Sequence, residues 1–214
     1  MTDTAANPNA DHIGNPLDLF RLDGRTAIVT GASSGLGVRI AKVLRAVGAN
    51  VVVAARRADR LADLVAQLPG AVAVQADLSL EADRERTVQT ALSQFGRVDV
   101  LVNNAGIGQK VAIEDETLER FRDAMELNVT AVWHLSKLVG PSMIANKGGS
   151  IINVASMLGL VGASPVKQAH YCASKGAVVN LTREMAAQWG RKGVRVNSLC
   201  PGWFESEMTA GMES

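Results

Sequence analysis

The sequence predicts an α/β fold in which helices cover both faces of a doubly wound, parallel sheet. Three observations indicate this class. Short runs of strand character alternate with longer amphipathic runs of helix character along the chain. The strand-like runs are apolar throughout, which is typical of strands buried on both faces. Glycine-rich and polar segments follow several of these runs, at the edge where open α/β sheets bind their ligands.

We expect residues 1–16 to form a disordered tail and residues 17–214 to form a single domain. The tail is polar, rich in Asn, Asp and Pro, and lacks the apolar stretch of a signal peptide. The pattern after the tail predicts six strands, at residues 25–30, 51–55, 71–75, 98–103, 151–156 and 194–199. It predicts helices between them, at residues 38–47, 58–68, 79–95 and 118–145, and a last one that begins near residue 170. Ser79 is the expected N-cap of the third helix.

Composition excludes several classes of function. The 214-residue chain is 47% hydrophobic with a net charge of +1, so it can bury the core of one domain. Charges of both signs are interspersed, which argues against nucleic acid or a membrane surface as a partner. The two cysteines, Cys172 and Cys200, are too few for a disulfide framework, and no zinc-type spacing occurs, so we expect no metal site. No apolar run approaches the ~20 residues that span a bilayer, and we expect a cytoplasmic protein.

A glycine-rich turn, TGASSGLG at residues 30–37, follows the first predicted strand and opens the first predicted helix. Its glycines let the backbone approach a pyrophosphate, and the helix N-terminus supplies unpaired N–H donors and a partial positive charge. We therefore predict a dinucleotide site at this turn. The alternative is a tight helix-entry turn that binds nothing.

Two arginines follow the second predicted strand, where the two nicotinamide coenzymes are usually distinguished. A carboxylate at this place binds the ribose 2′-OH of NAD, whereas an arginine accommodates the 2′-phosphate of NADP. Arg56 and Arg57 stand there and no acid does, which favours NADP(H) over NAD(H). We expect Arg56 to make this contact, with Ser33 as a second phosphate ligand. The alternative is that both arginines only solvate the start of the next helix.

Tyr171 and Lys175 are four residues apart near the start of the last predicted helix, so their side chains share one helix face. A phenol ionises near pH ~10, and a nearby ammonium lowers that pKa by favouring the phenolate. Ser156, at the end of the fifth predicted strand, could hold a carbonyl or alcohol oxygen against the phenol. These three residues predict a proton-transfer site, and the alternative is an ordinary surface pair. His170 points roughly 100° away from Tyr171 around the helix, so we expect it at the pocket edge or on the surface.

Together these segments resemble the classical short-chain dehydrogenase/reductase (SDR) family. The resemblance runs in the family's order from Leu22 to Met208 and rests on TGASSGLG at 30–37, DL at 77–78, NNAG at 103–106, Asn128, Ser156, YCASK at 171–175 and PG at 201–202. It implies a Rossmann-type catalytic domain that transfers a hydride between NADP(H) and a secondary alcohol or ketone. Whether the substrate is a 3-oxoacyl thioester, a sugar or polyol, or another ketone stays open.

The resemblance also implies residue roles. Tyr171 would be the general acid in carbonyl reduction and the base in alcohol oxidation. Lys175 would bind the nicotinamide ribose and hold down the pKa of the phenol, Ser156 would orient the substrate oxygen, and Asn128 would keep a water in line with Lys175. The expected coenzyme contacts are Gly31, Ser33, Ser34, Gly35, Leu36, Gly37, Arg56, Asp77, Leu78, Asn104, Ala105, Gly106, Tyr171, Lys175, Pro201 and Gly202. The expected substrate pocket comprises Ser156, Leu158, Tyr171 and Trp203.

Two features depart from the family's pattern. Ser156 and Tyr171 are fifteen positions apart, farther than the family usually shows, which indicates altered substrate selection. The chain ends at Ser214, where family members continue through a substrate lid and a last strand, so we expect either a fragment of a longer chain or a C-terminally shortened domain. The alternative function is therefore a nucleotide-binding or regulatory protein with impaired turnover. We further expect a homodimer or homotetramer that pairs through its long helices.

Overall fold

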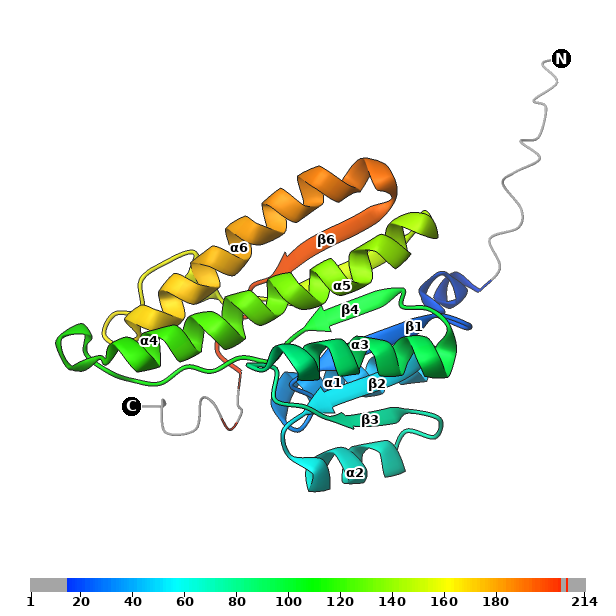
Figure 1. The fold of residues 1–214 in the computed structure, drawn as a ribbon, viewed down its shortest axis with the longest axis horizontal. Coiled ribbons are helices and arrows are strands. Elements are labelled where there is room, and N and C mark those ends of the chain that lie inside the picture. The colour runs from blue at the N-terminus through cyan, green and yellow to red at the C-terminus, as the bar shows by residue number, and fades with distance from the viewer. Residues whose placement is uncertain (1–14, 205–206, 208–214) are drawn as a thin grey trace, which may run out of the picture.

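The computed structural model describes residues 15–204 and 207, which contain one six-stranded parallel sheet (Figure 1). The strands lie in the order β3-β2-β1-β4-β5-β6. Their bounds are β1 Thr26–Thr30, β2 Asn50–Ala55, β3 Val72–Gln75, β4 Val100–Asn103, β5 Gly149–Val154 and β6 Val194–Leu199. The chain builds outward from β1 to one edge and then from β4 to the other, which creates the switch point at which such sheets bind ligands. The predicted doubly wound sheet is confirmed.

Helices cover both faces of this sheet. Their bounds are α1 Gly35–Ala46, α2 Ala58–Ala66, α3 Glu81–Phe95, α4 Leu118–Met125, α5 Ala131–Ala145 and α6 Ala169–Trp189. Side chains of α3, α5 and α6 pack on one face, and side chains of α1 and α2 pack on the other. In Figure 1, α3 and α5 cross in front of the strands, with β3 and β6 at opposite edges.

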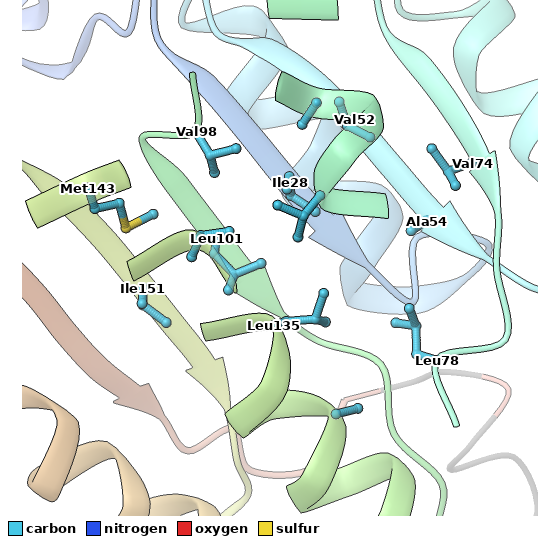
Figure 2. Packing of buried hydrophobic residues seen from close by; sticks show 14 of the residues in the cluster. Ile28, Val52, Ala54, Val74, Leu78, Val98, Leu101, Leu135, Met143 and Ile151 are labelled. Carbon is cyan, nitrogen blue, oxygen red and sulfur yellow. The ribbon is translucent and has the colours of Figure 1, made fainter. Parts of the chain in front are cut away.

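The central strands are mostly apolar because alternate residues enter two different cores. Figure 2 shows Ile28 of β1 and Leu101 of β4 packed with Leu135 of α5 in the first core. Their neighbours Val29 and Val102 point to the other face, where α1 and α2 lie. Burying each of these side chains stabilises the fold by about 1.5–3 kcal/mol, and the buried polar residues Asn103 and Asn153 of the central strands hydrogen-bond to each other.

The helix predicted over residues 118–145 is interrupted. A π-helical turn, η3 (Glu126–Thr130), separates α4 from α5. Asn128 lies in this turn with no exposed surface, and its side chain bonds to the backbone of Ile107. A sequence pattern of helical period does not reveal such a turn, because one extra residue barely disturbs the periodicity.

The prediction that Ser79 caps α3 is wrong. The Ser79 hydroxyl instead donates to Oδ1 of Asp77 at 2.7 Å, and the Ser79 N–H donates to the same oxygen at 3.0 Å. Leu80 is the N-cap residue, and its side chain makes no capping bond. Asp77 therefore uses its carboxylate to close the turn after β3.

Residues 1–14, and with them most of the predicted tail, lie outside the described residues. Short 3₁₀ helices occur at η1 (Pro16–Phe20), η2 (Ile113–Asp115), η4 (Met157–Gly159) and η5 (Gly190–Lys192). In the part of the chain that the structure describes, no helix is long and apolar enough to cross a membrane.

Candidate active site

The carboxyl ends of the strands border one cleft of about 540 Å³. Because all strands are parallel, their carboxyl ends meet at the same edge of the sheet. Residues at or just after the end of every strand line the cleft, at positions 31, 33–36, 55–57, 76–78, 104–109, 154–156 and 201–202. Tyr171 and Lys175 reach the cleft from the first turns of α6.

The glycine turn fits a pyrophosphate. Gly31 has a φ of +64°, and a Cβ there would lie 2.8 Å from Cα of Ala105, so only glycine suits both the conformation and the close approach. Ser34 is the N-cap of α1 but makes no side-chain capping bond, which leaves the N–H groups of the first turn available to an anion. Gly37 does not line the cleft. A Cβ on Gly37 would lie 2.4 Å from the Gly31 carbonyl oxygen, so Gly37 allows α1 to pack beneath the turn.

Thr30 and Asn104 fasten the glycine turn to the end of β4. The Thr30 hydroxyl oxygen accepts the N–H of Asn104 at 2.9 Å and the N–H of Ala105 at 3.0 Å. The Asn104 side chain donates in return to the Thr30 carbonyl at 2.9 Å. The two strand ends on either side of the switch point therefore hold each other in register.

Arg57, rather than Arg56, contacts the glycine turn. The Arg57 guanidinium donates to the Ser33 hydroxyl at 3.1 and 3.2 Å and pairs with Glu207 at 2.9 Å. This pairing lowers the pKa of the Glu207 carboxyl. Arg56 also lines the cleft, but its side chain is exposed and makes no hydrogen bond within the described residues. The predicted phosphate ligand Ser33 is thus already bonded to an arginine.

The Ser156 hydroxyl lies beside the phenol of Tyr171. Its oxygen accepts the N–H of Leu158 at 3.1 Å, which leaves its proton free to be donated. Burial raises the pKa of Tyr171 above its ordinary value, and the hydrogen bond with Ser156 acts in the opposite direction without cancelling that effect. The phenol is therefore held as a neutral acid in this structure.

Lys175 is buried and bonds to the backbone instead of the phenol. Its ammonium donates to the Val154 carbonyl at 2.8 Å and lies 5.6 Å from the centre of the Tyr171 ring. Burial lowers the pKa of Lys175 to about 8. The sequence-based expectation that Lys175 lowers the pKa of Tyr171 is therefore not met here, because removal from water is the largest influence on each group.

Asn128 holds the loop after β4. Its amide nitrogen donates to the Ile107 carbonyl and to the Ser174 hydroxyl, both at 2.9 Å, and its oxygen accepts the Ile107 N–H at 2.9 Å. A Cβ on Gly106 would lie 3.1 Å from the Asn128 oxygen and 3.3 Å from Nζ of Lys175. Asn128 and Lys175 thus approach the same glycine, although Asn128 itself does not line the cleft.

The cleft contains most of the predicted site residues and several that the sequence did not indicate. Among the predicted ones, Gly37, Asn128, Leu158 and Trp203 lie outside its lining. Leu158 is buried, and Trp203 is half-exposed. Residues that were not predicted as site residues also line it, namely Ala55, Arg57, Ala76, Ile107, Gly108, Gln109, Leu127, Val154, Ala155, Phe204 and Glu207. Ile107 to Gln109 directly follow the NNAG segment, so extending the predicted site along this loop would have included them. No local sequence pattern indicates Glu207.

The fold and this cleft define a class, an oxidoreductase built on a Rossmann-type dinucleotide-binding domain. More narrowly, the chain belongs to the short chain dehydrogenase family, whose sequence profile matches residues 25–214. It is 43% identical to D-beta-hydroxybutyrate dehydrogenase of Cupriavidus necator over 186 residues, which cover 85% of this chain and 71% of that protein.

Solved structures agree with this assignment. A short-chain dehydrogenase/reductase from Mycobacterium marinum superposes with a TM-score of 0.88 at 35% identity, covering 92% of this chain and 80% of the other. A gluconate 5-dehydrogenase from Burkholderia cenocepacia, solved in complex with NADP and tartrate, gives a TM-score of 0.85 at 33% identity, covering 94% and 80%. The predicted family is confirmed.

Proposed function

We propose that this chain is an NADP(H)-preferring dehydrogenase/reductase that interconverts a secondary alcohol and its ketone, with Tyr171 as general acid and base. One observation carries the proposal: Ser156, Tyr171 and Lys175 line the same cleft as the glycine turn. A dinucleotide held at that turn would extend along the sheet edge toward the phenol. The hydroxyl and phenol protons would then meet one substrate oxygen.

Each residue has a separate task in this proposal. The bound coenzyme supplies or accepts the hydride. Ser156 donates its free proton to the substrate oxygen and stabilises charge that develops on it. Tyr171 transfers its proton to that oxygen in reduction and removes it in oxidation. Lys175 keeps a positive charge near the phenol and offers its remaining protons to the ribose, while Asn128 fixes the adjacent loop and keeps a water in line with Lys175.

The preference for NADP(H) is supported by Arg57 and Ser33. Their side chains are bonded to each other at the rim of the cleft, beside the end of β2, where the 2′-phosphate would lie. A guanidinium and a hydroxyl are suitable partners for a phosphate dianion, and a charge-assisted hydrogen bond of this kind contributes about 1.5–3 kcal/mol. We propose Arg57 as the principal ligand, with Arg56 adding charge from the rim.

Two measurements test the proposed function. NADPH and NADH are first titrated against the protein, followed by nicotinamide fluorescence, and then D-3-hydroxybutyrate, gluconate and a polyol are offered with NADP⁺. We expect Tyr171→Phe to bind NADPH as the wild type does but to lose about 10²–10⁴-fold in turnover, the range for general acid–base catalysis. Near-normal turnover by that variant would remove Tyr171 from the mechanism. Coenzyme binding without turnover by the wild type would support a nucleotide-binding protein instead.

We further propose that two or four copies associate through α4 and α5. Three large apolar side chains on these helices are exposed, namely Leu118, Phe121 and Trp133. Single apolar side chains on a surface are ordinary, but several along one helix axis are typical of an interface. Light scattering on the purified protein measures the mass directly, and a monomer at micromolar concentration would contradict this part of the proposal.

A further inference from the structure

A buried histidine–glutamate pair, His170 and Glu116, adjoins the proposed catalytic Tyr171 at the start of α6. His170, in the first turn of α6, contacts an oxygen of Glu116 through Nδ1. The two side chains expose only 2% and 6% of their surface. The sequence placed His170 at the pocket edge or on the surface, so this burial is a correction. It arises because the segment between β4 and α4 folds over the start of α6.

The hydrogen bonds fix the protonation of the imidazole. The backbone N–H of Gln109 donates to Nε2 of His170 at 3.2 Å. An N–H group can only donate, so Nε2 carries a lone pair and the ring proton sits on Nδ1, facing the carboxylate of Glu116. His170 is therefore a two-sided clamp that accepts from Gln109 and donates to Glu116.

This clamp holds the cleft-lining loop against Tyr171. Gly108, next to Gln109, packs so closely on the phenol that a Cβ at Gly108 would lie 2.7 Å from Cδ2 of Tyr171. A second contact follows along the loop, where the Val111 N–H donates to the Lys167 carbonyl at 2.9 Å. Between these points the His170 imidazole joins the loop to α6, one residue before Tyr171.

We propose that His170 and Glu116 are positioning residues for Tyr171: Glu116 orients the imidazole, the imidazole holds the Gln109 N–H, and Gly108 is thereby kept against the phenol ring. This inference rests on the proposed role of Tyr171 in catalysis. Without the clamp, the loop can lift and the ring gains freedom to rotate away from Ser156. A displacement of about 1 Å at a reacting group can cost about 100-fold in rate, so an effect on kcat is expected from residues that never touch substrate.

Two substitutions at His170 separate positioning from simple packing. His170→Gln keeps an acceptor near Nε2 for the Gln109 N–H, whereas His170→Asn keeps only a donor near Nδ1 for Glu116. We expect His170→Asn to lower kcat by about 10- to 100-fold while KM and the NADPH dissociation constant stay within about 3-fold, and we expect His170→Gln to keep kcat within about 3-fold. A purely structural role would instead move the unfolding temperature of both variants and leave kcat per folded molecule unchanged.

Tyr171 offers a readout that needs no substrate, because it is the only tyrosine in the chain. Ultraviolet titration near the phenolate band therefore reports this one residue. We expect His170→Asn to shift the apparent pKa of Tyr171 down toward that of free phenol, since a lifted loop admits water. The wild-type value should persist in His170→Gln.

Substitutions at Glu116 give an independent test if His170→Asn does not fold. Glu116→Ala frees the imidazole and should reproduce the loss of kcat, while the isosteric Glu116→Gln still accepts from Nδ1 and should restore it. Wild-type kcat and an unchanged tyrosine titration in both His170→Asn and Glu116→Ala would overturn the inference, as would equal losses in His170→Asn and His170→Gln. Normal turnover by Tyr171→Phe would overturn the proposed function, yet the titration would still report whether the clamp positions the ring.

Discussion

The two halves of the sheet build their parts of the cleft from different materials. The half formed by β1 to β3 offers mostly backbone: a glycine turn, open N–H groups and an arginine bonded to that turn. The half formed by β4 to β6 offers side chains, with Ser156 at the end of β5 and Tyr171 and Lys175 on α6. Binding a pyrophosphate requires a backbone turn of the right shape, whereas transferring a proton requires side chains with suitable pKa values.

The electrostatics of the second half follow from burial more than from neighbours. Burial raises the pKa of Tyr171 and lowers the pKa of Lys175, so it shifts each equilibrium toward the neutral form, while Lys175 stays cationic below a pKa of about 8. The first half acts mainly through backbone N–H donors at the glycine turn, which do not titrate. A short sequence motif can therefore specify the shape of a binding turn. The pKa values at a proton-transfer site depend instead on all the segments that bury it.

Gly37→Ala should have the largest effect and would act at the glycine turn. Its Cβ would meet the Gly31 carbonyl oxygen at 2.4 Å, so the turn must shift away from α1. Losing two charge-assisted bonds to a phosphate corresponds to about 100-fold or more in NADPH affinity. Fluorescence titration measures this affinity, and the ultraviolet titration of Tyr171 should stay unchanged.

Gly162→Ala is the matched control for this variant. A Cβ at Gly162 meets nothing within 4 Å, so the same added methyl group should leave NADPH affinity unchanged. Equal affinity losses in the two variants, or none in Gly37→Ala, would contradict the idea that backbone shape makes this half of the site.

Arg57→Gln would remove a positively charged side chain that is bonded to the glycine turn. We expect NADPH affinity to fall by about 10- to 100-fold and NADH affinity to stay the same, because only NADPH carries the 2′-phosphate. Arg56→Gln is the neighbouring control and should change NADPH affinity by less than Arg57→Gln does. The reverse order would restore the assignment that the sequence favoured.

The sequence predicts the fold well because short apolar runs indicate strands buried on both faces, and the amphipathic runs between them indicate helices. It predicts the motif residues of the cleft for a related reason, since the segments 31–37 and 103–106 directly follow strands. It did not predict the contact of Arg57 with the glycine turn, the π-helical turn at Asn128 or the burial of His170. Each of these depends on contacts between distant segments, as when Glu116 approaches His170 across 54 residues.

The pH dependence of the wild type tests the second half. Lys175 is cationic below a pKa of about 8 and loses its proton above it, whereas burial keeps the Tyr171 proton in place to higher pH. We expect kcat/KM for ketone reduction to be level below pH 8 and to fall about tenfold per unit above it, as a single essential ionisation requires. Initial rates measured with NADPH in buffers of constant ionic strength give this profile.

The ultraviolet titration of Tyr171 is the control for that profile. The phenol should still be protonated where the rate declines, which assigns the decline to Lys175. A rate that stays level through this range would show that the ammonium charge is dispensable. A rate that falls together with phenol ionisation would assign the decline to Tyr171 instead.

Glu207→Gln should have the smallest effect and would test a link between the two halves. Glu207 follows β6, yet its carboxylate pairs with Arg57 at 2.9 Å, in the place where a phosphate would compete for the same guanidinium. Both side chains are about half-exposed, so water and salt screen the pair and its removal should raise NADPH affinity only about two- to fivefold. NADH affinity should not change, and the gain should shrink at high salt. A loss of NADPH affinity would mean that Glu207 orients Arg57 toward the coenzyme. The two halves of the sheet would then cooperate in binding, whereas the present geometry indicates that Glu207 and the phosphate compete for Arg57.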